Sequence, residues 1–281
     1  MSDTIQRADV ETLIRLSISE DIAGGDITSQ AIFKPEAASR AAILSKQEGV
    51  FCGSDMVRYV YEMIDSRVSV SQKAHDGDMI GKKETLMTIS GPTVSVLSGE
   101  RIALNFIQRM SGIATRTFHV VSLLKNRNIK LLDTRKTLPG FRALDKYAVK
   151  TGGGINHRMG LYDMVMIKDN HIRAAGSITR AVTMVRERYG TRYLIEVEAA
   201  DQNEVQEAIA IGADIIMLDN MDIPAMKAAV ELIRKKTKIE VSGNMDEEKI
   251  KKIRNLDIDY ISMGSLTHSV TAFDCSMEFD A

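Results

Sequence analysis

Tyr193-Leu194-Ile195-Glu196-Val197-Glu198 and Ile215-Ile216-Met217-Leu218-Asp219 contain two of the six short apolar runs that decide the fold of the second half of this chain. The runs recur at intervals of about 20 to 35 residues, and a helix-like segment follows each of them. This alternation is typical of β–α units around a parallel sheet, whose strands are almost continuously apolar because they are covered on both faces. The predicted strands are residues 129–132, 164–167, 193–197, 215–218, 239–241 and 260–263.

Polar residues follow every predicted strand. In parallel α/β folds the carboxyl ends of the strands form one edge, where ligands bind, so we expect these residues to surround a common site. Six strands are fewer than the eight of a complete barrel, which leaves open an incomplete barrel or an open doubly wound sheet. The residues are Thr134-Arg135-Lys136, Lys168, Glu198, Asp219, Ser242-Gly243-Asn244 and Gly264-Ser265.

Helix caps are expected between these strands. Ser177, Asp222 and Asp246 each precede a segment with helical periodicity, where a short oxygen-bearing side chain can accept a bond from a backbone N–H. Asp201 with Glu204 resembles a capping box. The caps therefore support helices in the segments between the strands.

The first half of the chain has a different pattern. Residues 10–18 have the spacing of a short amphipathic helix, and residues 96–125 predict a longer one. Between them, residues 38–90 form short runs separated by turn residues, which predicts a small and largely antiparallel sheet. The pair Ser111-Gly112 is a plausible break or kink in the longer helix.

Composition limits the classes of function. The chain has 281 residues, which predicts one large domain or two, and its net charge of −1 gives no general attraction to DNA or acidic lipid. Tryptophan is absent and aromatic residues are 5%, which argues against modules that stack on nucleic-acid bases. Cys52 and Cys275 lack the spacing of metal ligands and are interpreted as buried thiols. Residues 1–10 are polar, and we expect a soluble, cytosolic protein.

Positive charge is concentrated in one segment. Residues 129–171 contain eight Lys or Arg, four acids and two of the five histidines. Guanidinium groups and the backbone N–H groups of glycine-rich turns suit carboxylate and phosphate oxygens, so we favour a pocket for a polyanion over a solvated basic face. Gly152-Gly153-Gly154 lacks the spacing of a dinucleotide-binding motif, and His157 and Arg158 follow it directly. The glycines indicate a loop with close backbone approach or positive φ, although a flexible helix end is the alternative.

The ionic residues at the strand ends have alternative interpretations. Lys168 would need a partner if it is buried, and the partner could be a ligand anion, Asp163 or Asp169. Glu198 and Asp219 could bind ribose hydroxyls, hold a Mg²⁺ carried by a pyrophosphate, or stabilise positive charge on a sugar. A salt bridge from these acids to Lys136 or Lys168 is an equally good interpretation. The small residues of the last two strand ends favour a phosphate site.

Together these motifs resemble the family of nicotinate-nucleotide pyrophosphorylase, also called quinolinate phosphoribosyltransferase. The similarity extends over most of the chain. The residues that carry it include Glu20-Asp21-Ile22-Ala23-Gly24-Gly25-Asp26-Ile27-Thr28, Glu100-Arg101-Ile102-Ala103-Leu104-Asn105-Phe106, Ser111-Gly112-Ile113-Ala114-Thr115, Asp133-Thr134-Arg135-Lys136-Thr137-Leu138-Pro139-Gly140, Glu196-Val197-Glu198 and Met217-Leu218-Asp219-Asn220-Met221.

The resemblance implies a fold and a reaction. The implied fold is an α/β sandwich over residues 1–111, with the tail 267–281 packing back on it, and an incomplete six-stranded α/β barrel over residues 112–266. This is the arrangement of the type II phosphoribosyltransferases. The implied reaction joins quinolinate to 5-phosphoribosyl-1-pyrophosphate, with Mg²⁺ as cofactor, and gives nicotinate mononucleotide, pyrophosphate and CO₂. Members form homodimers or hexamers in which the neighbouring subunit completes each site.

The resemblance also implies a role for each matching residue. Arg101 would reach quinolinate in the neighbouring subunit, and Arg135, His157 and Arg158, next to Thr134, would hold its carboxylates. Lys136, Lys168, Glu198 and Asp219 would be the catalytic residues: the lysines would contact quinolinate and pyrophosphate, and the acids would face the ribose and its metal. The 5′-phosphate would bind Ser242, Gly243, Asn244, Met263, Gly264 and Ser265. Asn244 departs from a common glycine and Met263 from a smaller residue.

Two other functions remain open at this level. One is the related molybdenum-transport-associated protein, which shares the Thr-Arg-Lys-Thr-x-Pro-Gly block but is expected to differ around Asn156 and Lys168. The other is a non-catalytic sensor of a phosphoribosyl ligand. Release of pyrophosphate from quinolinate and the phosphoribosyl donor would distinguish the enzyme from both.

Overall fold

A computed structural model of the protein describes residues 4–125 and 128–280, which fall into two compact units. The sandwich unit comprises Met1–Phe118, Thr137–Gly153 and Leu266–Ala281, and the open-barrel unit comprises His119–Lys136 and Gly154–Ser265. The chain therefore passes between the units more often than a single boundary after residue 111 would require. That boundary and the one after residue 266 stay predictions.

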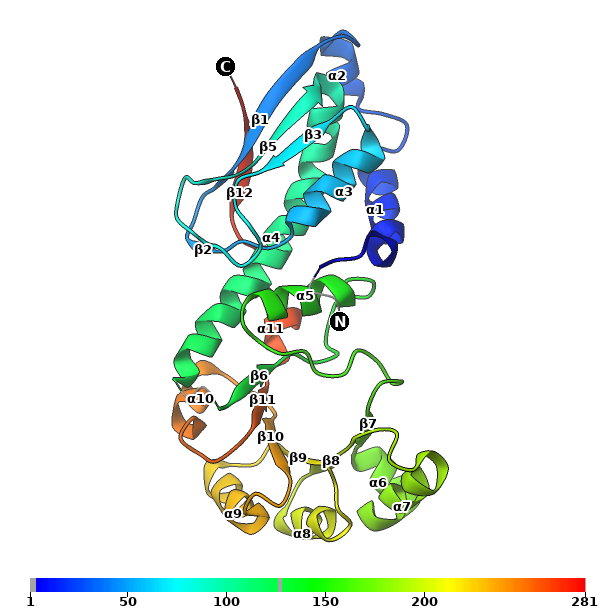
Figure 1. Ribbon diagram of the computed structural model, residues 1–281, viewed down its shortest axis with the longest axis vertical. Helices are drawn as coiled ribbons and strands as arrows, with labels where there is room; N and C mark the ends of the chain where they lie inside the picture. Colours follow the sequence, from blue (N-terminus) through cyan, green and yellow to red (C-terminus); the bar gives the residue numbers. More distant parts are fainter. Residues whose placement is uncertain (1–3, 126–127, 281) are drawn as a thin grey trace. The chain divides into compact units, whose positions relative to one another are not determined.

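The sandwich unit is built on a four-stranded antiparallel sheet with the order β12-β1-β5-β3. The sheet predicted within residues 38–90 is confirmed, and the tail adds its strand β12 beside β1, with Met277 opposite Ile43. Helices α1, α3 and α4 gather on one side of the sheet (Figure 1). The elements of this unit are α1 (Arg7–Asp21), α2 (Ile27–Ile32), β1 (Ala38–Ser45), β2 (Gly49–Val50), α3 (Ser54–Ile64), β3 (Ser69–Gln72), β4 (Met79–Ile80), β5 (Thr85–Pro92), most of α4 (Thr93–Leu124), α5 (Arg142–Thr151), most of α11 (Ser265–His268) and β12 (Cys275–Phe279).

Small residues allow helix α4 to pack closely. Of the break or kink predicted at Ser111-Gly112, the break is wrong, because α4 continues through both residues. A Cβ at Gly112 would lie 2.2 Å from the backbone oxygen of Thr271, and the Ser111 hydroxyl donates to the oxygen of Cys52 and accepts from its N–H. The pair therefore marks a tight contact with neighbouring backbone, a signal that resembles a helix break in sequence.

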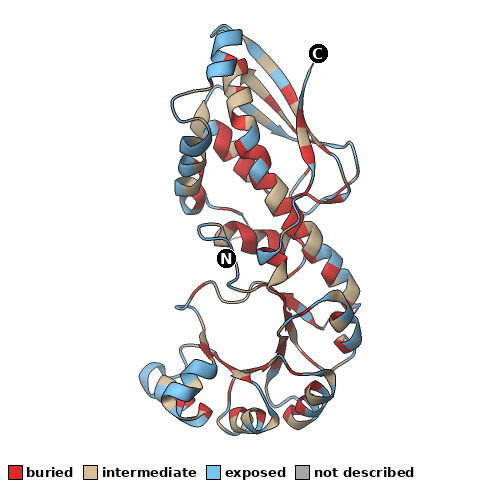
Figure 2. Ribbon diagram, turned by 180° about the vertical axis from the view of Figure 1, so that it is seen from behind, coloured by how far each residue is buried: buried red, intermediate tan, exposed pale blue. Residues whose placement is uncertain are grey.

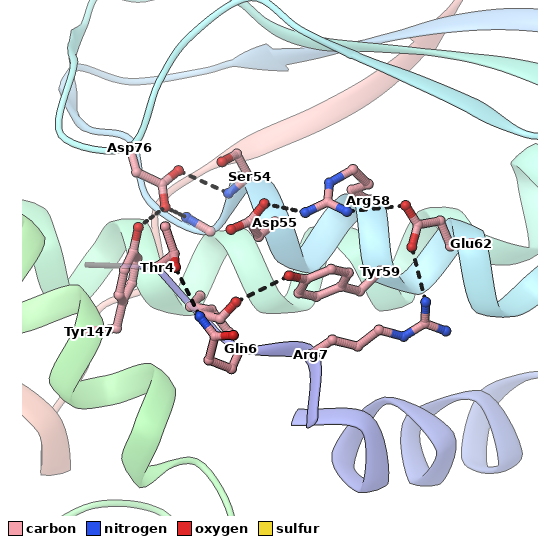
Figure 3. Close-up of polar contacts among 12 residues, drawn as sticks. Thr4, Gln6, Arg7, Ser54, Asp55, Arg58, Tyr59, Glu62, Asp76 and Tyr147 are labelled. Atoms are coloured by element: carbon pink, nitrogen blue, oxygen red, sulfur yellow. Dashed lines mark hydrogen bonds and ion pairs between the residues drawn. The ribbon is translucent and has the colours of Figure 1, made fainter. Parts of the chain in front are cut away.

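The half-buried carboxylate of Asp76 connects α3 and α5 (Figure 3). The residue before α3 is Gly53, which has no side chain to cap the helix, and the carboxylate of Asp76 accepts from the N–H groups of Gly53 and Ser54 instead. The Tyr147 hydroxyl of α5 donates to the same carboxylate over 2.9 Å. Burial and the Asp76 charge raise the pKa of Tyr147 well above its usual value, so the phenol stays a proton donor at physiological pH.

The open-barrel unit confirms all six predicted strands. They are β6 (Lys130–Leu132), β7 (Val165–Ile167), β8 (Ile195–Ala199), β9 (Ile215–Asp219), β10 (Lys238–Ser242) and β11 (Tyr260–Ser262). All pairs are parallel and the order is β6-β11-β10-β9-β8-β7, so the first strand pairs with the last. Within the described residues β6 and β7 do not pair with each other, which leaves the barrel incomplete.

The helices of this unit distinguish an incomplete barrel from a doubly wound sheet. They lie along the outer side of the curved sheet (Figure 1), whereas a doubly wound sheet would carry helices on both faces. The strands between them are mostly buried (Figure 2). The helices are α6 (Asp169–Ala175), α7 (Ile178–Tyr189), α8 (Gln202–Ala210), α9 (Ile223–Ile233) and α10 (Glu247–Ile253).

The four predicted N-cap residues are confirmed, whereas the capping box predicted at Asp201 is not formed, because Glu204 accepts from the N–H of Ala200 and not from that of Asp201. Ser177 accepts from the N–H of Arg180, and Asp201 accepts from two N–H groups at the start of α8. Asp222 and Asp246 cap α9 and α10 in the same way. Each such cap contributes about 1 kcal/mol, so the helix starts are encoded locally.

Two further properties concern the whole described chain. Cys52 and Cys275 are both buried free thiols, as predicted, and burial raises the pKa of Cys275 to about 12. Among the helices in residues 4–125 and 128–280, none combines the length and apolar content that crossing a membrane requires.

Candidate active site

The strand register brings predicted site residues to one face of the sheet. In a parallel sheet, paired residues point to the same face, and so do residues two apart along a strand. Glu198 pairs with Met217, two residues before Asp219, and Asp219 pairs directly with Ser242. Glu198, Asp219 and Ser242 therefore share a face at the carboxyl ends of three neighbouring strands, where ligands bind in this class of fold.

Lys168 and Glu198 form an ion pair at this edge. Lys168 directly follows β7, and its Nζ contacts Oε1 of Glu198 on β8. Of the partners considered for Lys168, the structure places Glu198 in contact, while Asp163 accepts from the N–H groups of Met159 and Gly160. The side chains of Lys168 and Glu198 remain 40% and 17% exposed, so both are accessible to a ligand.

Arg158 lies close to Arg135 and to the acids of β8. Its guanidinium donates to the backbone oxygen of Met164 over 3.2 Å and is half-buried. Burial and the nearby positive charge of Arg135 lower the pKa of Arg158, although Glu196 and Glu198 oppose this. A bound anion would stabilise the half-buried guanidinium of Arg158, and groups with shifted pKa values concentrate at functional sites.

His157 lies between two buried acids, Glu196 and Glu240. Its Nε2 is 3.1 Å from Oε2 of Glu196 and 3.5 Å from Oε2 of Glu240, and the three side chains are at most 7% exposed. Burial opposes a charge on the imidazole, but the carboxylates outweigh it and raise the pKa of His157 above its ordinary value. Burial also raises the pKa of Glu196 to about 7, with His157 lowering it and Glu240 raising it.

These three side chains bring potential metal ligands together. They are the one group of potential metal ligands within the described residues whose ligand atoms all lie within 4.8 Å of one another. A metal at Nε2 would need that lone pair and would leave the ring proton on Nδ1. Nδ1 lies 2.7 Å from the backbone nitrogen of Arg158, whose N–H donates to it when the ring is neutral with its proton on Nε2.

Asp133 positions the segment that carries His157 and Arg158. It follows β6, is fully buried, and accepts from Nδ2 of Asn156 over 2.7 Å and from the N–H of His157 over 2.9 Å. The sequence motif contained Asp133, but no role was predicted for it. Its signal is an acid at the end of an apolar strand, where burial requires hydrogen-bond partners.

The glycine-rich loop before this segment has the two properties predicted for it. A Cβ at Gly152 would lie 2.4 Å from the backbone oxygen of Ala114, and Gly153 has a φ of +88°. Close backbone approach and a positive φ both favour glycine. The loop is therefore a defined turn after α5.

The turn after β10 has the backbone of an anion site. Gly243 and Asn244 have φ of +92° and +46°, and successive N–H groups in such turns form a concave anion-binding surface. Asn244 occupies the left-handed region that favours glycine, and asparagine is one of the residues that tolerate it. Lys249 of α10 donates to the oxygen of Gly243 over 2.9 Å and supports the turn.

Most of the other predicted site residues follow β6 and β11, and Arg101 belongs to the sandwich unit. Thr134, Arg135 and Lys136 follow β6, which pairs with β11, and β11 leads into Met263, Gly264 and Ser265. The hydroxyl of Thr134 accepts from the N–H of Lys136, and the side chains of Arg135 and Lys136 are exposed. Met263 is 3% exposed, so its side chain belongs to the core and only its backbone could reach a ligand. Arg101 is exposed on α4 in the sandwich unit.

Comparison with protein families gives two adjoining matches. The N-terminal domain of quinolinate phosphoribosyl transferase matches residues 26–111, and the C-terminal domain matches residues 113–278. The two models together span most of the chain.

Individual relatives agree with the family models. The chain is 46% identical to a probable nicotinate-nucleotide pyrophosphorylase [carboxylating] of Bacillus subtilis, over 92% of this chain and 89% of that protein. It is 40% identical to the chloroplastic enzyme of that name in Arabidopsis thaliana, over 97% of this chain and 83% of the other. Among solved structures, NadC from Streptococcus pyogenes superposes with a TM-score of 0.95 at 38% identity, covering 99% of this chain and 98% of the other.

Proposed function

We propose a mechanism from the premise that this chain belongs to the quinolinate phosphoribosyltransferase family. The protein is a decarboxylating phosphoribosyltransferase of NAD biosynthesis. It transfers the phosphoribosyl group of 5-phosphoribosyl-1-pyrophosphate to quinolinate and gives nicotinate mononucleotide, pyrophosphate and CO₂.

The observation that carries the residue roles is the Lys168–Glu198 ion pair at the face that Glu198 shares with Asp219 and Ser242, at the carboxyl ends of the strands. Quinolinate has two carboxylates, and a bidentate guanidinium suits each of them. We assign the carboxylates to Arg135 and Arg158, next to Thr134. Direct binding by His157 stays a prediction, because both of its ring nitrogens already face protein groups.

The transfer step uses the charges at the strand ends. The ring nitrogen of quinolinate bonds to C1 of the ribose while the bond from C1 to the pyrophosphate oxygen breaks, and the electron pair leaves with pyrophosphate. Lys136 and Lys168 hold this leaving group. Glu198 and Asp219 stabilise the positive charge that develops on the ribose. The carboxylate beside the ring nitrogen then leaves as CO₂, its electron pair stays on the ring carbon stabilised by the pyridinium, and a proton replaces it.

The residues at the strand ends fit a Mg²⁺ ion brought by the donor substrate. Glu198 and Asp219 offer carboxylate oxygens on one face of neighbouring strands, and Mg²⁺ prefers oxygen ligands while keeping substrate phosphates in its coordination sphere. When bound, the ion would offset charge on the pyrophosphate. The 5′-phosphate is assigned to the backbone of the turns at Ser242, Gly243 and Asn244 and at Met263, Gly264 and Ser265.

The assembly and the location are part of the proposal. Arg101 is exposed and lies in the sandwich unit, which suits a residue that reaches quinolinate in the neighbouring subunit of a homodimer or hexamer. A cytoplasmic location stays a prediction.

Pyrophosphate release tests the catalytic roles. Lys136→Ala should leave folding intact and lower turnover by about 100-fold or more, because a preorganised charge on the leaving group is lost. Lys130→Ala is the matched control, since Lys130 is an exposed lysine at the amino end of β6, the strand that Lys136 follows. Wild-type turnover in Lys136→Ala would remove Lys136 from the mechanism. Absence of pyrophosphate release in the unmodified protein would instead contradict the function.

A further inference from the structure

Asn220 joins two parts of the site that the mechanism treats separately. It follows Asp219 at the end of β9, and its N–H donates to the backbone oxygen of Ser242 over 3.2 Å. Its side-chain Nδ2 donates to Oδ2 of Asp219 over 2.8 Å, and its Oδ1 accepts from Nδ2 of Asn244 over 3.3 Å. The carboxylate and the turn after β10 are thus connected through one amide.

The chemistry of the groups fixes the direction of this chain of bonds. An ionised carboxylate can only accept, so the amide must present Nδ2 to Asp219 and Oδ1 to Asn244. Asn244 must then present its own Nδ2. Each amide has one orientation that satisfies its neighbours, and the Asp219 carboxylate keeps Oδ1 for a ligand.

The same amide leaves no space for a side chain at position 243, which is glycine. A Cβ at this position would lie 2.3 Å from Oδ1 and 2.7 Å from the backbone nitrogen of Asn220, closer than side chains tolerate. Its φ of +92° also favours glycine. The Asn220 amide therefore lies directly against the backbone of the turn, and the fit between them is mutual.

We propose that Asn220 is a positioning residue that sets the separation between the Asp219 carboxylate and the turn at 242–244, with Asn244 as its anchor. The proposal rests on the proposed function, in which Asp219 faces the ribose and the turn binds the 5′-phosphate of the same substrate. Asn220 then keeps a fixed distance between the carboxylate that faces the ribose and the turn that binds the 5′-phosphate. The Asn244 side chain contributes a hydrogen bond that glycine could not make.

The test uses Asn220→Gly, because glycine keeps the positive φ of +53° at residue 220 and removes only the amide. We expect the KM for the phosphoribosyl donor to rise about tenfold, the loss that follows from one hydrogen bond to a charged group, with the KM for quinolinate unchanged. Lys235→Gly is the matched control, since Lys235 also has a positive φ, of +62°, in the same unit and lies outside the site. Thermal unfolding of both variants shows whether the fold is retained.

A double-mutant cycle tests the anchor. Asn244→Gly should raise the donor KM by about twofold to threefold, and Asn220→Gly with Asn244→Gly together should be no worse than Asn220→Gly alone, because Asn244 acts through Asn220. Binding of ribose 5-phosphate, measured by calorimetry, should weaken in parallel without any turnover. A donor KM within twofold of wild type in Asn220→Gly, or additive effects in the double variant, would overturn the proposal. Failure of the proposed function would appear differently, as absence of pyrophosphate release in the wild type.

Discussion

Replacement of Asp133 gives the strongest test of how the site is supported. The buried carboxylate satisfies two donors, the amide of Asn156 and the N–H of His157. A buried donor that loses its acceptor costs about 1–3 kcal/mol, so Asp133→Ala should lower the free energy of unfolding by about 2–6 kcal/mol. Asp133→Asn keeps the shape and one acceptor, and should lose about 1–3 kcal/mol. Both losses are large against the usual total of about 5–15 kcal/mol.

The matched control is Asp163, in the same segment. Its carboxylate also accepts from two backbone N–H groups, of Met159 and Gly160, but its side chain is exposed. Water can replace these bonds, so Asp163→Ala should cost less than about 1 kcal/mol. Urea unfolding followed by circular dichroism measures both variants. Equal losses at Asp133 and Asp163 would refute the argument that burial makes Asp133 a structural support.

Two further predictions concern pH and backbone space. The raised pKa values of Glu196, about 7, and of His157 mean that the folded protein holds protons that the unfolded chain releases, so stability should fall as pH rises above about 4.5. Glu196→Gln should flatten this fall between pH 4.5 and 7 in thermal unfolding, and an unchanged slope would show that Glu196 does not titrate there. Gly243→Ala should raise the KM for the phosphoribosyl donor because it displaces Asn220, whereas Gly212→Ala, with a φ of +75° and nothing within 4 Å, should cost only about 1 kcal/mol of stability and leave the kinetics unchanged. Equal kinetics in the two alanine variants would show that strain alone explains Gly243.

Local patterns predicted the elements well. Apolar runs located all six parallel strands, and Ser177, Asp201, Asp222 and Asp246 located the helix starts, because strand periodicity and capping depend on residues close together in the sequence. The pattern failed at Ser111-Gly112, where close packing against Thr271 requires small residues within a continuous helix. Packing of this kind leaves the same local signal as a break.

The sequence predicted which residues belong to the site better than it predicted which of them contact each other. Strand-end positions and the family motifs indicated Lys168, Glu198 and Asp219, and a salt bridge from these acids to Lys136 or Lys168 was one of the interpretations. The structure shows that the pair is Glu198 with Lys168. Asp133 and Asn220 had no predicted role, since their partners lie on segments 23 and 24 residues away in the sequence. Glu196 and Glu240 likewise had no predicted role, because only the fold places His157 between them.

The amino-acid sequence by itself determined the β–α order, the helix caps and the family, because short motifs encode each of them. Only the tertiary structure decided that β6 pairs with β11, that Lys168 contacts Glu198, and that His157 lies between two buried acids. These contacts join residues far apart along the chain, so they depend on strand register and burial. Both arise only when the whole unit has packed, and the charges of the site take their final environment at that stage.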